Sequence, residues 1–258
     1  MNRIDLNSDV GERPEALRDG SEEELMRYVS SANIACGGHA GDDSTMDVVV
    51  SIAKKYGVSV GAHPSFPDRE NFGRLKMKLR LEEIEQCVFD QVRRLAQIAK
   101  LQHVELRHVK PHGALYNVAV QDARVAEAIA RGAGKCDKLL ILFGLAGSRM
   151  IDVWRDLGMR VVREAFADRS YEADGSLRSR KFHDALITDP TEAARRAVLI
   201  AREGIVKAVD GTMLSLHADT ICIHGDTPNS ISIAEAVRRA LEEAGIAISP
   251  VPNSSSEK

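Results

Sequence analysis

Short apolar runs and helix-like segments alternate along almost the whole chain. The runs with strand-like composition lie at 3–9, 32–36, 57–63, 104–110, 138–144, 159–166 and 220–225. Segments with apolar residues near the helical period lie at 21–30, 43–56, 80–101, 120–132, 146–157, from 190 onward and at 229–244. This alternation predicts an α/β fold, most simply a single irregular (β/α) barrel of about seven parallel strands over 1–250. An open doubly wound sheet is the alternative, and residues 251–258 are expected to form a frayed C-terminal tail.

Two helix starts carry specific signals. Ser21 is followed three residues later by Glu24, which is the spacing of a capping box and predicts Ser21 as an N-cap. Pro190 suits the first turn of a helix. Before it, the polar segment 167–187 is expected to be a loop lying over the mouth of the barrel.

Polar, glycine-punctuated phrases follow the ends of the apolar runs: DLNSDVGE, NIACGGHAGD, GAHPSFPD, VKPHGALYN and CIHGDTP. In parallel α/β folds the ligand site forms at the C-terminal ends of the strands, so these phrases are expected to meet at one mouth. Side chains alternate along a strand, which places Asn7 and Asp9 on the face opposite Ile4 and Leu6. The same count predicts the inward set Asp9, His63, Lys110, His112 and His224.

Two chemistries suit this set. Aspartate and histidine side chains from separate strands can hold a divalent metal, with Asp9, His63 and His224 as the predicted ligands. Alternatively, the carboxylates act as general acid and base, while Lys110 binds an anionic group of the substrate.

Simpler structural roles compete with each assignment. A single inward histidine is more often a hydrogen-bonded core residue than a ligand. Asn7 and Asp9 could cap a helix, Glu12 could be a solvated loop carboxylate, and Tyr116 could belong to the core. The convergence of several polar groups favours a shared pocket, because burying them singly without partners is costly.

The composition excludes several classes of protein. Hydrophobic residues make up 44% and charged residues 28% of the 258 residues, as in ordinary globular proteins, and the formal net charge of -3 gives no electrostatic case for nucleic acid. No run approaches the roughly 18 apolar residues of a membrane span, and the N-terminus lacks the apolar region of a secretory signal. The four scattered cysteines predict reduced thiols and a cytoplasmic location. Dinucleotide, P-loop, HExxH and GxSxG motifs are also missing from the sequence.

Seven ordered motifs resemble the LamB/YcsF family: the five phrases above, with ANIACGGHAGD in its full length, together with EAFADRSY and GSLRSR. The resemblance runs from about residue 4 to about residue 247. It implies a barrel like that of polysaccharide deacetylases. It also implies the activity of the A subunit of an ATP-dependent 5-oxoprolinase, which opens the lactam ring of 5-oxoproline to glutamate together with subunits B and C.

The residues of these motifs take their expected roles from this reaction. The expected catalytic residues are Asp9, Lys110, His112, Glu164 and Asp168. The expected substrate- or nucleotide-binding residues are Asn7, Asn33, His39, Tyr116 and Arg169. ATP is expected as co-substrate without a recognisable motif, bound here or on a partner. A stand-alone metal-dependent amide hydrolase or deacetylase, and a non-catalytic substrate-binding subunit, are the alternatives.

Overall fold

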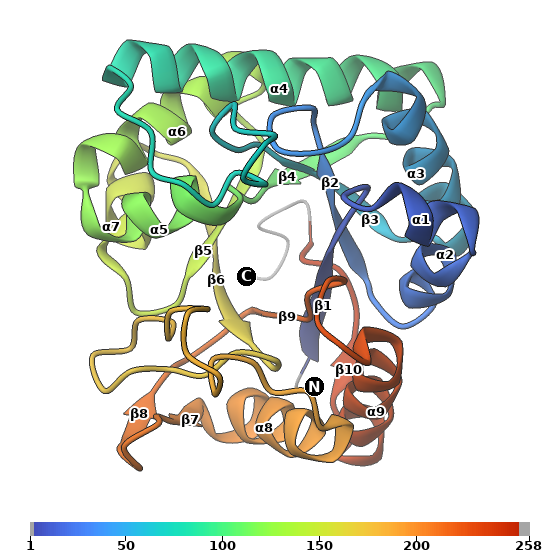
Figure 1. Ribbon diagram of the computed structural model, residues 1–258, viewed down its shortest axis with the longest axis vertical. Coiled ribbons are helices and arrows are strands. Elements are labelled where there is room, and N and C mark those ends of the chain that lie inside the picture. The colour runs from blue at the N-terminus through green and yellow to red at the C-terminus, as the bar shows by residue number, and fades with distance from the viewer. Residues whose placement is uncertain (1–2, 253–258) are drawn as a thin grey trace.

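The structure is a computed structural model that describes residues 3–252. Within these residues, seven parallel strands close into a barrel in the order β1-β2-β3-β4-β5-β6-β9, because β9 pairs with both β6 and β1 (Figure 1). The strands are β1 Arg3–Val10, β2 Ser31–Ala35, β3 Ser59–His63, β4 Leu106–Val109, β5 Ile141–Leu145, β6 Arg160–Phe166 and β9 Thr220–Cys222. This closure confirms the predicted barrel and excludes the open doubly wound sheet.

In the described part of the chain, three short strands lie outside the closed ring. Strand β10, Ala247–Ile248, pairs with the start of β1. Strands β7, Ile205–Lys207, and β8, Met213–Ser215, form an antiparallel pair of their own. The sequence pattern predicted none of the three, since each is too short to show a period.

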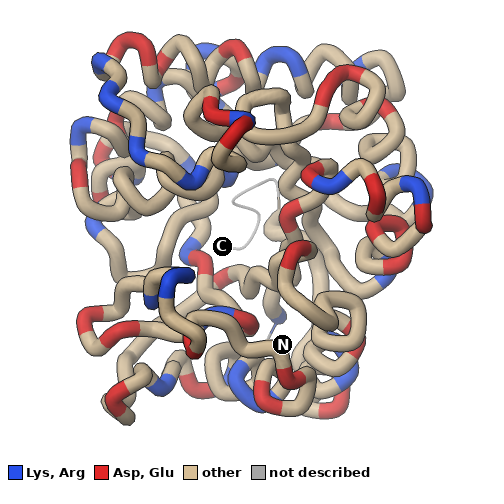
Figure 2. Tube along the Cα trace, in the orientation of Figure 1, with Lys and Arg blue, Asp and Glu red and all other residues tan. Residues whose placement is uncertain are grey.

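Helices surround the barrel (Figure 1). They are α1 Pro14–Arg18, α2 Ser21–Met26, α3 Asp43–Tyr56, α4 Leu81–Leu101, α5 Gly113–Gln121, α6 Ala123–Cys136, α7 Arg149–Asp156, α8 Pro190–Glu203 and α9 Ser230–Glu243. Charged positions of both signs are spread over these helices and the loops, in keeping with the small net charge (Figure 2). The main apolar core lies between the strands and the helices, and Leu6, Ile34 and Trp154 are fully buried in it.

The inside of the barrel carries polar side chains along β1, beside a small apolar cluster of Ile141, Phe143 and Val162. Along β1, Leu6 joins the apolar core, whereas Asp5 and Asn7 are buried and hydrogen-bonded. Asp5 accepts hydrogen bonds from the hydroxyls of Ser30 at 2.6 Å and Thr220 at 2.5 Å. Burial nevertheless raises the pKa of Asp5 above its ordinary value. The alternation predicted from the sequence is therefore present, with the polar face turned inward.

Two helix predictions were wrong in detail. Helix α2 ends at Met26 rather than near residue 30, and its N-cap is Gly20 at φ 81° rather than Ser21. Ser21 is the first helical residue; its hydroxyl donates to Ala16 O at 3.4 Å, and its backbone N–H donates to Asp19 Oδ1 at 2.9 Å. The helix expected at 120–132 is two helices that meet at Asp122, whose side chain caps α6 by accepting from Arg124 N.

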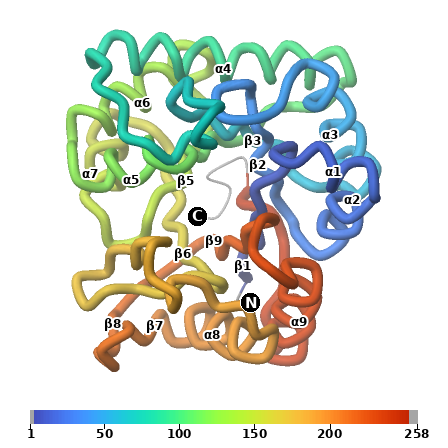
Figure 3. Tube along the Cα trace, in the orientation of Figure 1, coloured from blue at the N-terminus to red at the C-terminus, as the bar shows by residue number. Residues whose placement is uncertain are grey.

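The polar segment between β6 and α8 folds back beside the barrel opening (Figure 3). Isolated bridges join Arg169 to Leu186 and Tyr171 to Leu177 within it. Helix α8 begins at Pro190 as predicted, with Asp189 as its cap. At the other end of the chain, Val251 packs against a small apolar cluster, and residues 253–258 of the expected frayed tail lie outside the described residues. No helix within 3–252 is long and apolar enough to cross a membrane.

Candidate active site

The ends of the strands bring polar side chains together as the alternation predicted. Lys110, just after β4, places Nζ 2.9 Å from Oδ1 of Asp9 near the end of β1. His63 at the end of β3 has Nε2 3.3 Å from Asp9 Oδ2. His224, after β9, has Nε2 3.9 Å from the same oxygen. The roles assigned to these residues stay predictions, but their meeting at one mouth is a feature of the structure.

Lys110 lies among four acceptor groups. Its Nζ is 2.9 Å from Asp9 Oδ1, 2.9 Å from Glu164 Oε1, 3.0 Å from Cys222 Sγ and 3.2 Å from Asn7 Oδ1. Burial opposes the ammonium charge, yet Asp9, Cys222 and Glu164 outweigh it and raise the pKa of Lys110 well above its ordinary value. Burial likewise opposes ionisation of Asp9, but His63 and Lys110 hold the pKa of Asp9 well below its ordinary value. Lys110 is therefore a fixed positive charge at neutral pH and not a nucleophile.

A buried amide network fixes the Asp9 carboxylate from below. Asn33 Nδ2 donates to Asp9 Oδ1 at 2.8 Å and to Asn7 Oδ1 at 2.8 Å. His108 Nε2 lies 2.8 Å from Asn33 Oδ1, so the histidine is the donor there. Asn7 and Asn33 are 0% exposed and are not among the described residues that line the large pocket. Their geometry is that of positioning residues beneath Asp9, whereas the sequence had suggested contact with a ligand.

Glu12 and three histidines form a second cluster beside Asp9. Glu12 Oε1 is 2.8 Å from His39 Nε2 and 3.2 Å from His112 Nδ1. His63 Nε2 lies 3.0 Å from His112 Nδ1, and the rings of His39 and His112 stack with centroids 3.7 Å apart. The Glu12 side chain is 7% exposed, so it is not a solvated loop carboxylate. Burial opposes its ionisation, but His112 and His39 hold the pKa of Glu12 well below its ordinary value.

His224 is oriented by Asp168. Its ring Nδ1 lies 3.0 Å from Asp168 Oδ1, and its backbone N–H donates to Asp168 Oδ2 at 2.9 Å. Thr227 Oγ1 donates to the same oxygen at 2.6 Å. Burial opposes ionisation of Asp168, but His224 and Thr227 lower its pKa to about 2. The carboxylate therefore keeps the proton on Nδ1 and leaves Nε2 of His224 for proton exchange on the side of Asp9.

Glu164 stands behind Lys110 and is 0% exposed. Besides its ion pair with Lys110, it accepts a hydrogen bond from the Tyr116 hydroxyl at 2.9 Å. Burial and Glu164 raise the pKa of Tyr116 well above its ordinary value, so the hydroxyl stays a donor. Glu164 thus positions Lys110 and Tyr116, and Tyr116 itself lines the large pocket.

This pocket has a volume of about 570 Å³ and opens over the mouth of the barrel. Arg169, Arg180 and Arg74 line it at the rim. Arg169 donates to the carbonyl oxygens of Arg178 at 2.7 Å and Ala185 at 3.4 Å, so part of its guanidinium is used within the loop. Arg180 Nη1 donates to Asp226 Oδ2 at 2.8 Å, and Arg74 pairs with the same carboxylate.

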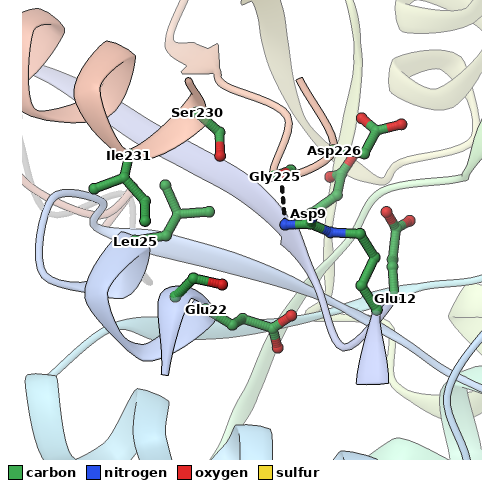
Figure 4. Close-up of a pocket in the computed structure, with 10 residues that line it drawn as sticks. Asp9, Glu12, Glu22, Leu25, Gly225, Asp226, Ser230 and Ile231 are labelled. Atoms are coloured by element: carbon green, nitrogen blue, oxygen red, sulfur yellow. Dashed lines mark hydrogen bonds between the residues drawn. The ribbon is translucent and has the colours of Figure 1, made fainter. Parts of the chain in front are cut away.

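A side cavity of about 20 Å³ adjoins Asp9 (Figure 4). Glu22 Oε1 accepts the Gly11 N–H there at 2.8 Å. Burial raises the pKa of Glu22 to about 7. Arg13 also lines the cavity, and its Nη2 donates to Gly225 O at 2.8 Å.

The structure divides the expected metal ligands between two groups. In each group all the potential ligand atoms lie within 4.8 Å of one another. His63 belongs with Glu12, His39 and His112, whereas Asp9 and His224 belong with Cys222. Glu12, Cys222, Arg180 and Asp226 were not predicted as site residues. Glu12 lies within the DLNSDVGE phrase and Asp226 within CIHGDTP, which is the signal that could have found them.

Comparisons with known proteins give matches over nearly the whole chain. The family model described as LamB/YcsF family matches residues 4–256. A protein from Chloroflexus aggregans, named as the A subunit of 5-oxoprolinase, is 52% identical over 96% of this chain and 98% of its own length. The crystal structure of a lactam utilization protein from Thermus thermophilus superposes with a TM-score of 0.89 at 43% identity, over 96% of this chain and 100% of that chain. A T48 deacetylase matches with a TM-score of 0.50 at 16% identity, over 96% and 87% of the two chains, and shares the fold alone.

Proposed function

The chain belongs to the LamB/YcsF family, and from this premise we propose that it is the A subunit of a 5-oxoprolinase, a hydrolase that opens the cyclic amide of 5-oxoproline to glutamate. Relatives that carry this name match nearly the whole chain, and the lactam utilization protein shares its fold over the same span. The proposal further includes that ATP drives the reaction, that subunits B and C take part in it, and that the residues of the pocket have the roles given below.

The arrangement of three side chains in the pocket is the main chemical support for the proposal. Asp9, Lys110 and His224 meet in one pocket whose volume of about 570 Å³ suits a small molecule. Acyl transfer to water requires an anion that acts as a base, a fixed cation and an oriented imidazole. Asp9, Lys110 and His224 are these three groups.

The proposed reaction has three steps. Transfer of the γ-phosphoryl group of ATP to the amide oxygen releases ADP and makes the carbonyl carbon electrophilic. Water then adds to this carbon, the carbon–nitrogen bond breaks, and the nitrogen leaves as an amine after gaining a proton. The resulting acyl phosphate takes up a second water to give the carboxylate and inorganic phosphate.

We assign each step to a group that the pocket presents. Asp9 accepts the proton of the attacking water, since it is ionised at neutral pH and held in place by Lys110. His224, whose Nδ1 proton is held by Asp168, takes up at Nε2 the proton that Asp9 removed from water and then donates it to the leaving nitrogen. Lys110 stabilises the negative oxygen that develops on the substrate.

ATP and the carboxylate of the substrate need positive groups at the entrance. Arg74, Arg169 and Arg180 line the rim of the pocket, and arginine binds phosphate and carboxylate groups in a bidentate manner. Subunits B and C complete the assembly in this proposal. We also propose a cytoplasmic location, where ATP is present and where Cys36, Cys87, Cys136 and Cys222, all unpaired in the structure, would stay reduced.

The test is reconstitution. The chain is mixed with subunits B and C, and release of glutamate and of phosphate from ATP is followed with 5-oxoproline as substrate. The chain alone should give little turnover, and the mixture should couple one product to the other. A mixture that folds and assembles but gives no 5-oxoproline-dependent ATP hydrolysis would reject the proposal. Unchanged turnover with Lys110→Met would favour the non-catalytic binding subunit instead.

A stand-alone metal-dependent amide hydrolase is the second candidate. The cluster of Glu12 with His39, His63 and His112 favours it, since such donor sets bind divalent metals. It predicts hydrolysis that is independent of ATP and abolished by a chelator, measured on the chain without partners.

A further inference from the structure

We propose that Glu12, His39, His63 and His112 form a binding site for one divalent transition-metal ion, distinct from the Asp9–His224 pair. Their potential ligand atoms all lie within 4.8 Å of one another. The separations to Glu12 Oε1 are 2.8 Å for His39, 3.2 Å for His112 and 3.7 Å for His63. Ligand atoms about 2.0–2.1 Å from a tetrahedral zinc ion lie about 3.3 Å apart, so this spacing already resembles that of a coordination shell.

The tautomers of two histidines are fixed from behind. His63 Nδ1 lies 2.7 Å from the carbonyl oxygen of Lys110, and His112 Nε2 lies 2.9 Å from the carbonyl oxygen of Phe72. A carbonyl oxygen only accepts, so each of these nitrogens carries the proton. This is the arrangement by which proteins orient a metal-binding imidazole through its second nitrogen.

The consequence is a concentration of electron pairs at the centre of the cluster. With their protons placed outward, His63 Nε2 and His112 Nδ1 face each other at 3.0 Å with lone pairs on both sides. Glu12 Oε1 and Asp9 Oδ2, at 3.7 Å and 3.3 Å from His63 Nε2, also present lone pairs. Neutral imidazoles cannot hydrogen-bond to each other in this state, so the centre requires a positive charge, which a metal ion bound by all four groups would supply.

His39 completes the set from the buried side. Its side chain is 0% exposed, Nε2 points to Glu12, and Nδ1 has no hydrogen-bond partner among the described residues. Within residues 3–252 no backbone carbonyl fixes the His39 tautomer, so its ring proton can sit on Nδ1 and leave Nε2 as a fourth ligand. Glu12, His63 and His112 line the large pocket, which leaves the ion open to solvent on one side.

The other group of potential ligands is less suited to a metal. Burial raises the pKa of the Cys222 thiol well above its ordinary value, whereas metals bind the thiolate. Lys110 Nζ lies 3.0 Å from Cys222 Sγ and would repel a second cation. An ion at Glu12 would instead sit on the far side of Asp9 and, when bound, would polarise a carbonyl or phosphate oxygen that enters the pocket.

The site is tested on the full chain, stripped with a chelator and dialysed. Titration with Zn²⁺ by calorimetry should give one equivalent bound, and Co²⁺ should give visible absorption bands of a four-coordinate site. Glu12→Gln and His112→Gln should each weaken Zn²⁺ binding by more than about 100-fold, the upper end of effects seen for outer-shell changes. Circular dichroism and thermal melts check that each variant is folded.

Two control variants locate the ion. His183→Gln removes an exposed histidine and should leave binding unchanged. His224→Gln should also retain the ion, whereas loss of binding there would place the metal at Asp9 and overturn the assignment. Wild-type protein that binds no equivalent of Zn²⁺ or Co²⁺ would show that a proton, not a metal, supplies the positive charge. The result is independent of the proposed lactam reaction, because binding is measured without substrate or partners.

Discussion

Replacing Lys110 with methionine removes a buried charge while keeping most of the side-chain volume. The ammonium lies 2.9 Å from one oxygen of Asp9 and 2.9 Å from one oxygen of Glu164, and its side chain is 3% exposed. Removing one partner of a buried ion pair costs about 3–5 kcal/mol, because the remaining charge is left without compensation. Two carboxylates lose their partner here, so we expect the upper part of that range at pH 7.

The assay is urea unfolding at a series of pH values. With a denaturant slope of about 2 kcal/mol per molar urea, the midpoint should fall by about 2 M. In the wild type, Lys110 and His63 lower the pKa of Asp9, and this stabilisation is present above the unfolded pKa and is lost as the pH falls through the folded one. In the variant the unpaired carboxylates have raised pKa values, so the free energy of unfolding of the variant falls further below that of the wild type as the pH rises. The two stability curves should therefore converge in acid.

The control is Lys55→Met, which breaks an ion pair with Glu23 whose lysine side chain is 63% exposed. It should leave the urea midpoint close to that of the wild type, because solvent screens such a pair. A Lys110→Met deficit below about 1 kcal/mol at pH 7, or one that stays constant down to pH 4, would refute the assignment of Lys110 as a buried counter-ion.

Three further predictions follow from single contacts. Asp168→Asn should lower kcat of the reconstituted enzyme by about 10²–10⁴-fold and change the pH profile of kcat. The reason is that His224 loses the acceptor that fixes its tautomer. An equal loss of kcat at every pH would argue against this positioning role. Glu22→Gln should raise the free energy of unfolding above pH 7 by up to about 3 kcal/mol. The pKa of Glu22 is 4.5 in the unfolded chain and about 7 in the folded one, so the wild type loses stability as the pH rises between these values, whereas the amide does not titrate. Unfolding curves at pH 5 and 8 test this prediction. Gly61→Ala should cost about 1–3 kcal/mol or more in urea unfolding, because a Cβ at this position would overlap the His108 ring; a neutral result would mean that the ring moves freely.

The inward residues on strands could be predicted because a strand has a period of two. Ile4 and Leu6 had to face the helices, so Asn7 and Asp9 had to face inward. The same counting holds for His63, and together these positions define the base of the site. The period does not tell which inward group contacts a ligand, and Asn7 proved to be a support for its neighbours.

Residues in turns could not be placed by this argument. Glu12 follows Gly11, whose φ of 73° lies in the left-handed region, and beyond such a turn the alternation of β1 no longer predicts direction. The failed cap at Ser21 has a similar origin, since Gly20 at φ 81° takes the N-cap position and Asp19 takes the Ser21 N–H. In both cases the backbone conformation of a turn, and not the period of the strand or helix, determined where the side chain lies.

The charge balance of the mouth links the proposed reaction to the proposed ion. Among the described residues at its base, carboxylates outnumber ammonium groups: there are Asp9, Glu12, Glu164 and Asp168, and Lys110 is paired with only Asp9 and Glu164. Buried anions without compensation are unstable, and an anionic substrate would be repelled from them. The arginines at the rim can hold the phosphate and carboxylate groups away from this base, while the amide turns toward Lys110. A cation held by Glu12 and the histidines would balance the remaining charge, so lactam opening should become sensitive to the ion even if ATP binds entirely at the rim or on a partner.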